Sequence, residues 1–265
     1  MTRAVRAAFG AAVAALALTV AGCGPATSAP GAPGSGLGLG SGSGERASVT
    51  VLVASSAVAP VQQLATAFEA SHPAVTVRVS GGSSATLVAQ VAAGAPADLV
   101  VTAGEAVLAG LSPAARRRPT VVVATNSLEI ATPPSNPAAL AGLAGLGSAD
   151  VKVVACVPSA PCGAAADAVL AKAGATAHIV SRELDARATL AKVRLGEVDA
   201  AIVYRSDVVS AGGAVHGIPI PPEHNVTLTY PLVRLTDSPE AGAFAAVLGS
   251  PQARPVWAAA GFGMP

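Results

Sequence analysis

The stretch from Val49 to Phe68 reads VTVLVASSAVAPVQQLATAF and places a strand directly before a helix. Its first five residues, up to Val53, are almost wholly apolar, which is typical of a strand covered on both faces. Pro60 can begin a helix because its fixed φ suits the first turn, and apolar residues then recur at helical spacing as far as Phe68. The stretch therefore predicts one strand–helix unit of an α/β fold.

The same alternation continues along the chain. Apolar runs predict further strands at residues 75–79, 98–101, 121–124, 128–131, 151–157, 200–204 and 231–235. Helical spacing predicts further helices around residues 87–91, 164–173, 186–195, 241–248 and 252–260. Strands that alternate with helices form parallel-rich sheets with helices on their faces. We expect two lobes, the first made of residues 47–125 with 226–265 and the second of residues 126–225.

The N-terminus has the pattern of a bacterial export signal. Two arginines, Arg3 and Arg6, precede an apolar run at residues 7–20 that is too short to span a membrane comfortably. Cys23 then follows small residues, as in a lipobox, where the cysteine becomes lipidated; an ordinary signal peptide with an incidental cysteine is the alternative. We expect a signal peptide at 1–22, a lipidated Cys23 with a flexible Gly/Ser/Pro tether at 23–46, and a lipid anchor on the outer face of the cell membrane.

The charge balance argues against a nucleic-acid partner. The formal net charge is only +1, and the one basic cluster, Arg116 to Arg118, reads as a solvated loop or helix end. Hydroxyl and small residues gather instead where strands lead into helices. Ser55, Ser56, Ser83, Ser84, residues 158–163, Asp185 and Tyr204 all occupy such positions. Ligands of open α/β sheets bind there, beside helix N-termini that attract anions, although serines there are also common helix caps and Tyr204 could simply be packed.

Short segments that are typical of one protein family run in order through nearly the whole chain after the tether. They are Val51-Leu-Val-Ala-Ser-Ser56 with Leu64-Ala-Thr-Ala-Phe68, Gly82-Ser-Ser-Ala-Thr-Leu87, Gly94-Ala-Pro-Ala-Asp-Leu99, Ala124-Thr-Asn126, Val157 to Gly163, Asp185-Ala-Arg-Ala-Thr-Leu190, Gly196 to Asp207, His224-Asn225 with Tyr230-Pro231, and Ala260-Gly-Phe-Gly263. Each segment is weak alone, and together they are specific. Through them the chain resembles the periplasmic molybdate-binding proteins of ABC importers.

The resemblance implies a two-lobe periplasmic-binding-protein fold of type II with an oxyanion held between the lobes. It implies side-chain donors at Ser56, Ser84 and Tyr204, and backbone N–H donors at Cys162 and Ala186. It further implies a monomeric receptor for molybdate, or for tungstate of the same charge and nearly the same size, that delivers its ligand to an ABC permease. No cofactor and no metal beyond the oxyanion are expected.

Cys156 and Cys162 remain once Cys23 is assigned to lipidation. In an exported protein two such cysteines favour a disulfide, with free thiols or metal ligands as the alternative.

Three other functions compete with molybdate capture. The chain could be a receptor for another tetrahedral oxyanion, or a signalling lipoprotein of the same fold without a transport role. A hydrolase using Ser56 or Ser84 is disfavoured, because neither serine lies in Gly-x-Ser-x-Gly and none of the histidines is placed in a motif beside them. We therefore expect a binding protein and not an enzyme.

Overall fold

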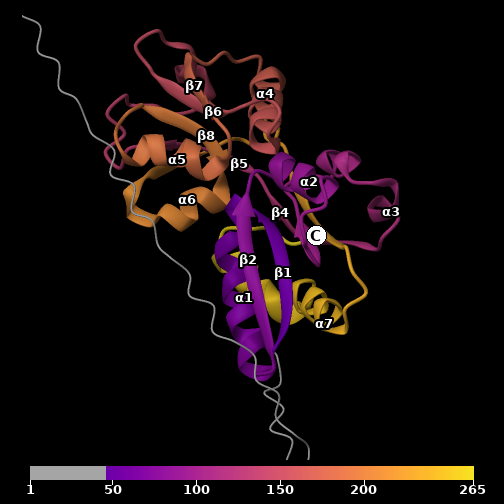
Figure 1. Cartoon of the computed structure of the whole chain (residues 1–265). Coiled ribbons are helices and arrows are strands. Elements are labelled where there is room, and N and C mark those ends of the chain that lie inside the picture. Colours follow the sequence, from indigo (N-terminus) through magenta and orange to yellow (C-terminus); the bar gives the residue numbers. More distant parts are fainter. Residues whose placement is uncertain (1–45) are drawn as a thin grey trace, which may run out of the picture. The chain divides into compact units, whose positions relative to one another are not determined.

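Residues 46–265 form two five-stranded sheets with helices packed against them in the computed structural model, which describes this part of the chain (Figure 1). The expected signal peptide, the lipidation site Cys23 and the tether up to residue 45 lie outside the described residues. Between residues 46 and 265, no helix combines the length and the apolar character that crossing a membrane requires.

The first sheet has the strand order β2-β1-β3-β10-β4. Its strands are β1 (Ala47–Ala54), β2 (Val75–Gly82), β3 (Leu99–Val101), β4 (Thr120–Asn126) and β10 (Leu228–Arg234). β1 runs parallel to β2 and β3, whereas β10 runs antiparallel to β3 and β4. Val49, Val51 and Val53 of β1 have no exposed surface. The apolar run at residues 49–53 thus forms the buried interior of this sheet.

The second sheet repeats the same plan with the order β7-β6-β8-β5-β9. Its strands are β5 (Leu128–Thr132), β6 (Val153–Cys156), β7 (Ile179–Glu183), β8 (Ala200–Tyr204) and β9 (His216–Pro219). β6 runs parallel to β7 and β8, and β5 runs antiparallel to β8 and β9. Each sheet is therefore parallel on one side and antiparallel on the other.

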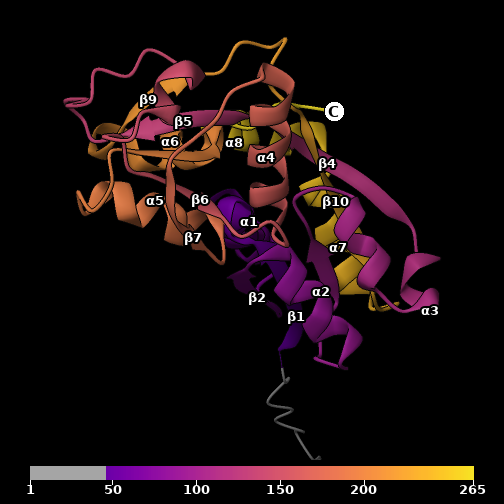
Figure 2. The same cartoon turned by 90° about the horizontal axis from the view of Figure 1, so that it is seen from above.

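Helices cover both sheets (Figures 1 and 2). They are α1 (Val58–Ser71), α2 (Ser84–Ala92), α3 (Pro113–Arg116), α4 (Pro161–Ala173), α5 (Ala186–Arg194), α6 (Arg205–Ala211), α7 (Pro239–Leu248) and α8 (Arg254–Ala259), with short 3₁₀ turns between several of them. Side chains alternate across β1, so Val51 packs with α1 and α7 while Leu52 packs with α2 on the opposite face. Strand periodicity thus places helices on both faces of the first sheet.

The chain passes between the two sheets twice, and one side chain ties the two crossings together. β4 ends at Asn126 and β5 begins at Leu128, while β9 and β10 are joined by residues 220–227. In the second crossing, the Asn225 amide accepts a hydrogen bond from Leu128 N–H (3.1 Å) and donates one to the Leu128 carbonyl (2.8 Å). These two bonds satisfy the N–H and the carbonyl of Leu128, the first residue of β5, and so join the second crossing to the first.

The main strands and helices expected from the sequence are present, but two edge strands and two helices were not predicted. The missed elements are the edge strands β7 and β9, the four-residue helix α3 and the seven-residue helix α6. The antiparallel direction of β5 and β10 was not predicted either, because apolar runs give no strand direction.

Candidate ligand-binding site

The five ligand donors that the family resemblance implied all line one small cavity between the two sheets. Ser56, Ser84, Cys162, Ala186 and Tyr204 face it, together with Ala54, Ser55, Gly82, Ser83, Ala103, Pro161 and Asp185. β1, β2 and β8 end at this cavity, and α2, α4 and α5 begin there. The fold therefore brings together strand ends and helix starts that lie far apart in the sequence.

Ser84 is held so that its hydroxyl proton is free to point into the cavity. It is buried at the start of α2, and its oxygen accepts a hydrogen bond from Ala103 N–H at 2.9 Å. The described residues provide no acceptor for its own proton. Because a hydroxyl carries one donor, Ser84 is left to donate that proton to a ligand.

The Tyr204 hydroxyl is buried without any hydrogen-bond partner in the described part of the chain. The tyrosine side chain is 2% exposed and stands at the end of β8, against the cavity. Burial raises the pKa of Tyr204 well above its usual value, so the phenol keeps its proton. An unpaired buried hydroxyl costs about 1–3 kcal/mol, and a ligand in the cavity would remove that cost.

Helix starts supply further donors. The first N–H groups of an α-helix have no acceptor within the helix, and Cys162 and Ala186 occupy the first turns of α4 and α5. The cavity lining contains no lysine, arginine or histidine. Its one charged residue, Asp185, caps α5 by accepting a hydrogen bond from Ala188 N–H at 2.9 Å. The site thus offers neutral donors and the positive ends of helices, which favour an anion.

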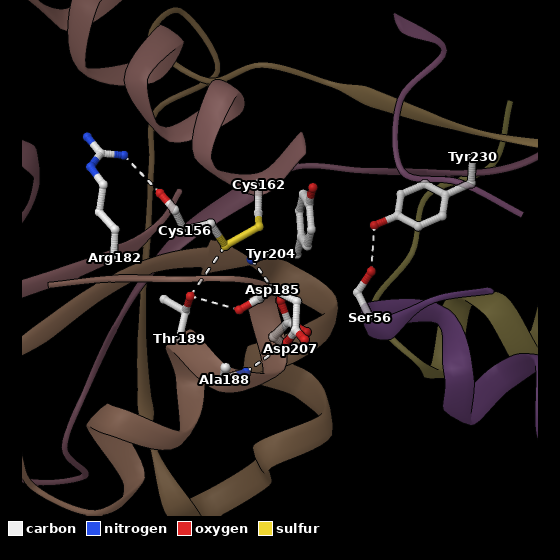
Figure 3. The surroundings of a disulfide bond; sticks show 10 residues. All are labelled: Ser56, Cys156, Cys162, Arg182, Asp185, Ala188, Thr189, Tyr204, Asp207 and Tyr230. Carbon is white, nitrogen blue, oxygen red and sulfur yellow. Dashed lines mark hydrogen bonds between the residues drawn. A yellow bond between two sulfur atoms is a disulfide. The ribbon is translucent and has the colours of Figure 1, made fainter. Parts of the chain in front are cut away.

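The expected disulfide between Cys156 and Cys162 is present and joins the end of β6 to the first turn of α4 (Figure 3). Both cysteines are buried. The Thr189 hydroxyl lies 3.3 Å from the Cys156 sulfur and donates its proton to the Asp185 carbonyl. The disulfide therefore ties the first turn of α4, which carries the Cys162 N–H, to the end of β6.

Three polar residues near the cavity were not assigned to the site from the sequence. Tyr230 bonds Ser56, with 2.8 Å between the hydroxyl oxygens, and Asn126 bonds Tyr230 in turn. Figure 3 shows the Ser56–Tyr230 pair on one side of the Tyr204 ring and the disulfide on the other. Asn126 and Tyr230 lie in segments that carry the family resemblance, but no local pattern indicated their contact with Ser56.

The third missed residue is Asp207, in the first turn of α6. Its carboxylate accepts a hydrogen bond from Tyr204 N–H at 3.0 Å, and it is almost fully buried. Burial raises the pKa of Asp207 from its usual 3.8 to about 7; the bond from Tyr204 N–H and the charge of Arg187 oppose the rise, and the charge of Asp185 adds to it.

We predict that Asp207 makes the folded protein less stable as pH rises from about 4 to about 7. In this range the folded protein keeps a proton on Asp207 that the unfolded chain has released, so rising pH favours unfolding. Above this range the cost stays constant, on the order of 4 kcal/mol. Urea unfolding of Asp207→Asn at pH 5, 6, 7 and 8 should lack this component. The exposed Asp150 provides the control Asp150→Asn, which should keep it; an unchanged pH dependence in Asp207→Asn would contradict the prediction.

A larger cavity of about 940 Å³ lies elsewhere, formed by residues 138–151, 173–176 and 219–224. It borders the C-terminal end of α4, roughly 17 Å along the helix from Cys162. Its lining is mostly alanine, glycine, leucine and proline, and His224 is its only residue of the Asp, Glu, Lys, Arg and His group. The convergent donors distinguish the smaller cavity as the candidate site.

Comparison with known proteins agrees with this architecture. Residues 49–263 match the family model of the bacterial extracellular solute-binding proteins. The molybdate-binding protein ModA of Mycobacterium tuberculosis is 31% identical over 223 residues, which cover 82% of this chain and 85% of that protein. The solved periplasmic molybdate-binding protein of Azotobacter vinelandii has a TM-score of 0.67 at 21% identity, covering 82% of this chain and 99% of that one. The sulfate-binding protein SubI of Mycobacterium tuberculosis H37Rv has a TM-score of 0.71 at 23% identity, covering 82% and 86%. The two structural matches show a shared fold.

Proposed function

This chain belongs to the bacterial extracellular solute-binding proteins, and we propose that the solute it captures is a tetrahedral oxyanion, molybdate or tungstate. The proposal places the anion in the small cavity, with Ser56, Ser84 and Tyr204 as side-chain donors and with Cys162 and Ala186 as backbone donors. The 31% identity to a molybdate-binding protein supports the choice of ligand.

The observation that carries the proposal is the unpartnered Tyr204 hydroxyl. A buried donor without an acceptor is costly, and native proteins rarely keep one without a function. The Tyr204 hydroxyl belongs to a residue that lines the cavity, where other donors converge and where the lining contains no basic side chain. An anion with oxygens on all sides would accept from all of these groups at once.

Neutral donors suit capture followed by release. Hydrogen bonds to an ionised acceptor are roughly twice as strong as neutral ones, so several of them can hold a dianion without a fixed counter-charge. Tungstate has the charge of molybdate and nearly its size, so we expect both to bind. Sulfate is smaller and would leave some donors too distant, which should weaken its binding.

The remaining parts of the proposal concern the setting of the site. Residues 47–125 with 226–265 and residues 126–225 would act as two lobes that close over the anion. The closed receptor would deliver the anion to an ABC permease. Lipidated Cys23 would hold the exported protein, as a monomer, at the outer face of the cell membrane.

Thermal unfolding with a panel of anions tests the proposed ligand. Molybdate, tungstate, sulfate and phosphate are each added to the purified protein at equal ionic strength. A ligand at a hundred times its Kd adds about 2.7 kcal/mol, which raises the melting temperature by roughly 5–10 °C for a protein of this size. We expect that rise with molybdate and tungstate.

Other outcomes would change the assignment. A rise with sulfate or phosphate alone would retain an oxyanion receptor and overturn the choice of molybdate. No rise with any of the four anions would overturn oxyanion capture and favour the alternative of a signalling lipoprotein without a transport role.

A further inference from the structure

A series of hydrogen bonds leads from the first crossing between the sheets to the candidate site. Ser127 N–H donates to the Asn126 side-chain oxygen at 3.0 Å. The Asn126 amide nitrogen donates to the Ser206 hydroxyl at 2.7 Å and to the Tyr230 hydroxyl at 3.3 Å. The Tyr230 hydroxyl in turn lies 2.8 Å from the Ser56 hydroxyl, which lines the cavity.

The direction of each bond in this series follows from the number of donors. Ser127 N–H can only donate, so it fixes the Asn126 oxygen on its side and turns the amide N–H groups toward Ser206 and Tyr230. The oxygen of Tyr230 therefore accepts a bond from Asn126. The Tyr230 proton must then go to Ser56, its remaining neighbour in the series.

The opposite direction would leave a buried proton without an acceptor. Tyr230 has no exposed surface, so water cannot satisfy its hydroxyl. A Ser56 proton pointing at Tyr230 would strand the phenolic proton, at a cost of about 1–3 kcal/mol. Burial also raises the pKa of Tyr230 far above its usual value, against the opposing bonds from Ser56 and Asn126, so the proton stays on the phenol.

We infer that Tyr230, oriented by Asn126, donates its proton to one of the two Ser56 lone pairs and leaves the Ser56 proton for the cavity, and so makes the site favour unprotonated oxyanions over protonated ones. This inference rests on the proposed function and adds a specificity-determining residue that does not itself line the cavity. Ser84 is committed in the same way by Ala103 N–H, and Tyr204 is a phenol without an acceptor. All three hydroxyls then present protons to the ligand.

A protonated oxyanion brings a proton to this site, where the hydroxyl groups already direct their own protons at the ligand. Near neutral pH phosphate carries a proton that needs an acceptor, and a hydroxyl that already accepts one bond has a single lone pair left while its own proton faces the cavity. Asp185 is the one acidic residue at the cavity, and one of its carboxylate oxygens is engaged by Ala188 N–H. Sulfate has nearly the size of phosphate and no proton at this pH. A comparison of sulfate and phosphate affinities therefore shows the effect of the ligand's proton apart from the effect of its size.

Tyr230→Phe provides the test, because it removes one hydroxyl and keeps the ring that packs edge-on against Phe262, with 5.0 Å between the ring centroids. Sulfate and phosphate dissociation constants are measured at pH 7 by competition with molybdate, in the full protein. We expect the sulfate-to-phosphate preference to fall about tenfold in Tyr230→Phe, because both Ser56 lone pairs are then free and the hydroxyl can turn one toward the proton of phosphate.

A double-mutant cycle with Ser56→Ala separates this role from a structural one. Asp185, the acidic residue at the cavity, is present in every protein of the cycle. Differences in the sulfate-to-phosphate ratio between these proteins therefore come from Ser56 and Tyr230. In the Ser56→Ala background, Tyr230→Phe should leave the sulfate-to-phosphate ratio unchanged. An unaltered ratio in the single Tyr230→Phe variant would overturn the inference, as would an equal change with and without Ser56. Failure of the wild-type protein to bind any of the three anions would instead show that the proposed function is wrong.

Discussion

Tyr204→Phe is expected to weaken molybdate binding by roughly 10- to 100-fold while leaving the ligand-free protein at least as stable as the wild type. The loss of affinity follows from removing one donor to a charged acceptor, which is worth about 1.5–3 kcal/mol. The effect on stability follows from the wild-type hydroxyl, which is buried without a partner in the described residues. Phenylalanine keeps the ring and removes the group that costs energy.

These opposite effects distinguish a ligand-binding hydroxyl from a structural one. A hydroxyl that supports the fold would cost stability when removed, as Ser84→Ala should, because that change leaves the buried Ala103 N–H without its acceptor. Isothermal titration with molybdate and urea unfolding without ligand provide the two measurements for both variants. A stability loss in ligand-free Tyr204→Phe, or an unchanged molybdate Kd, would contradict the role given to Tyr204.

The sequence predicted the strand–helix units because each is a local pattern. The Val49–Phe68 stretch shows its strand and helix through neighbouring residues, and Ser56 and Ser84 lie at junctions that such patterns reveal. The missed elements carry weaker local signals. β9 is a four-residue edge strand that contains glycine and proline, and α6 begins directly after β8 without a turn residue between them.

The contacts around Ser56 were not predictable because they depend on sheet register. Tyr230 lies 174 residues from Ser56 in sequence and pairs with Ala124 across the antiparallel β10–β4 contact. A shift of one residue would turn its side chain to the other face of the sheet. Apolar runs do not give register or direction, so the sequence indicated the hydroxyls at the site without the groups that set their direction.

Gly163→Ala is expected to lower both stability and molybdate affinity, although it adds a single methyl group. A Cβ at this position would lie 2.0 Å from the Val157 carbonyl oxygen and 2.7 Å from that of Cys156. Both obstacles are backbone atoms, so no side chain can rotate away. The loop is also held by the disulfide and by the bond from Val157 N–H to the Glu183 carbonyl at 2.8 Å.

The start of α4 must therefore move, and the Cys162 N–H moves with it. We expect a loss of roughly 2–4 kcal/mol in the free energy of unfolding, in the range of overpacked core substitutions, and a molybdate Kd raised at least tenfold. Gly213→Ala is the matched control, because an added Cβ at that exposed glycine has no atom within 4 Å. Urea unfolding and titration of both variants give the comparison. If Gly163→Ala matched Gly213→Ala in stability and affinity, the close packing of this loop against α4 would not be what positions the Cys162 N–H.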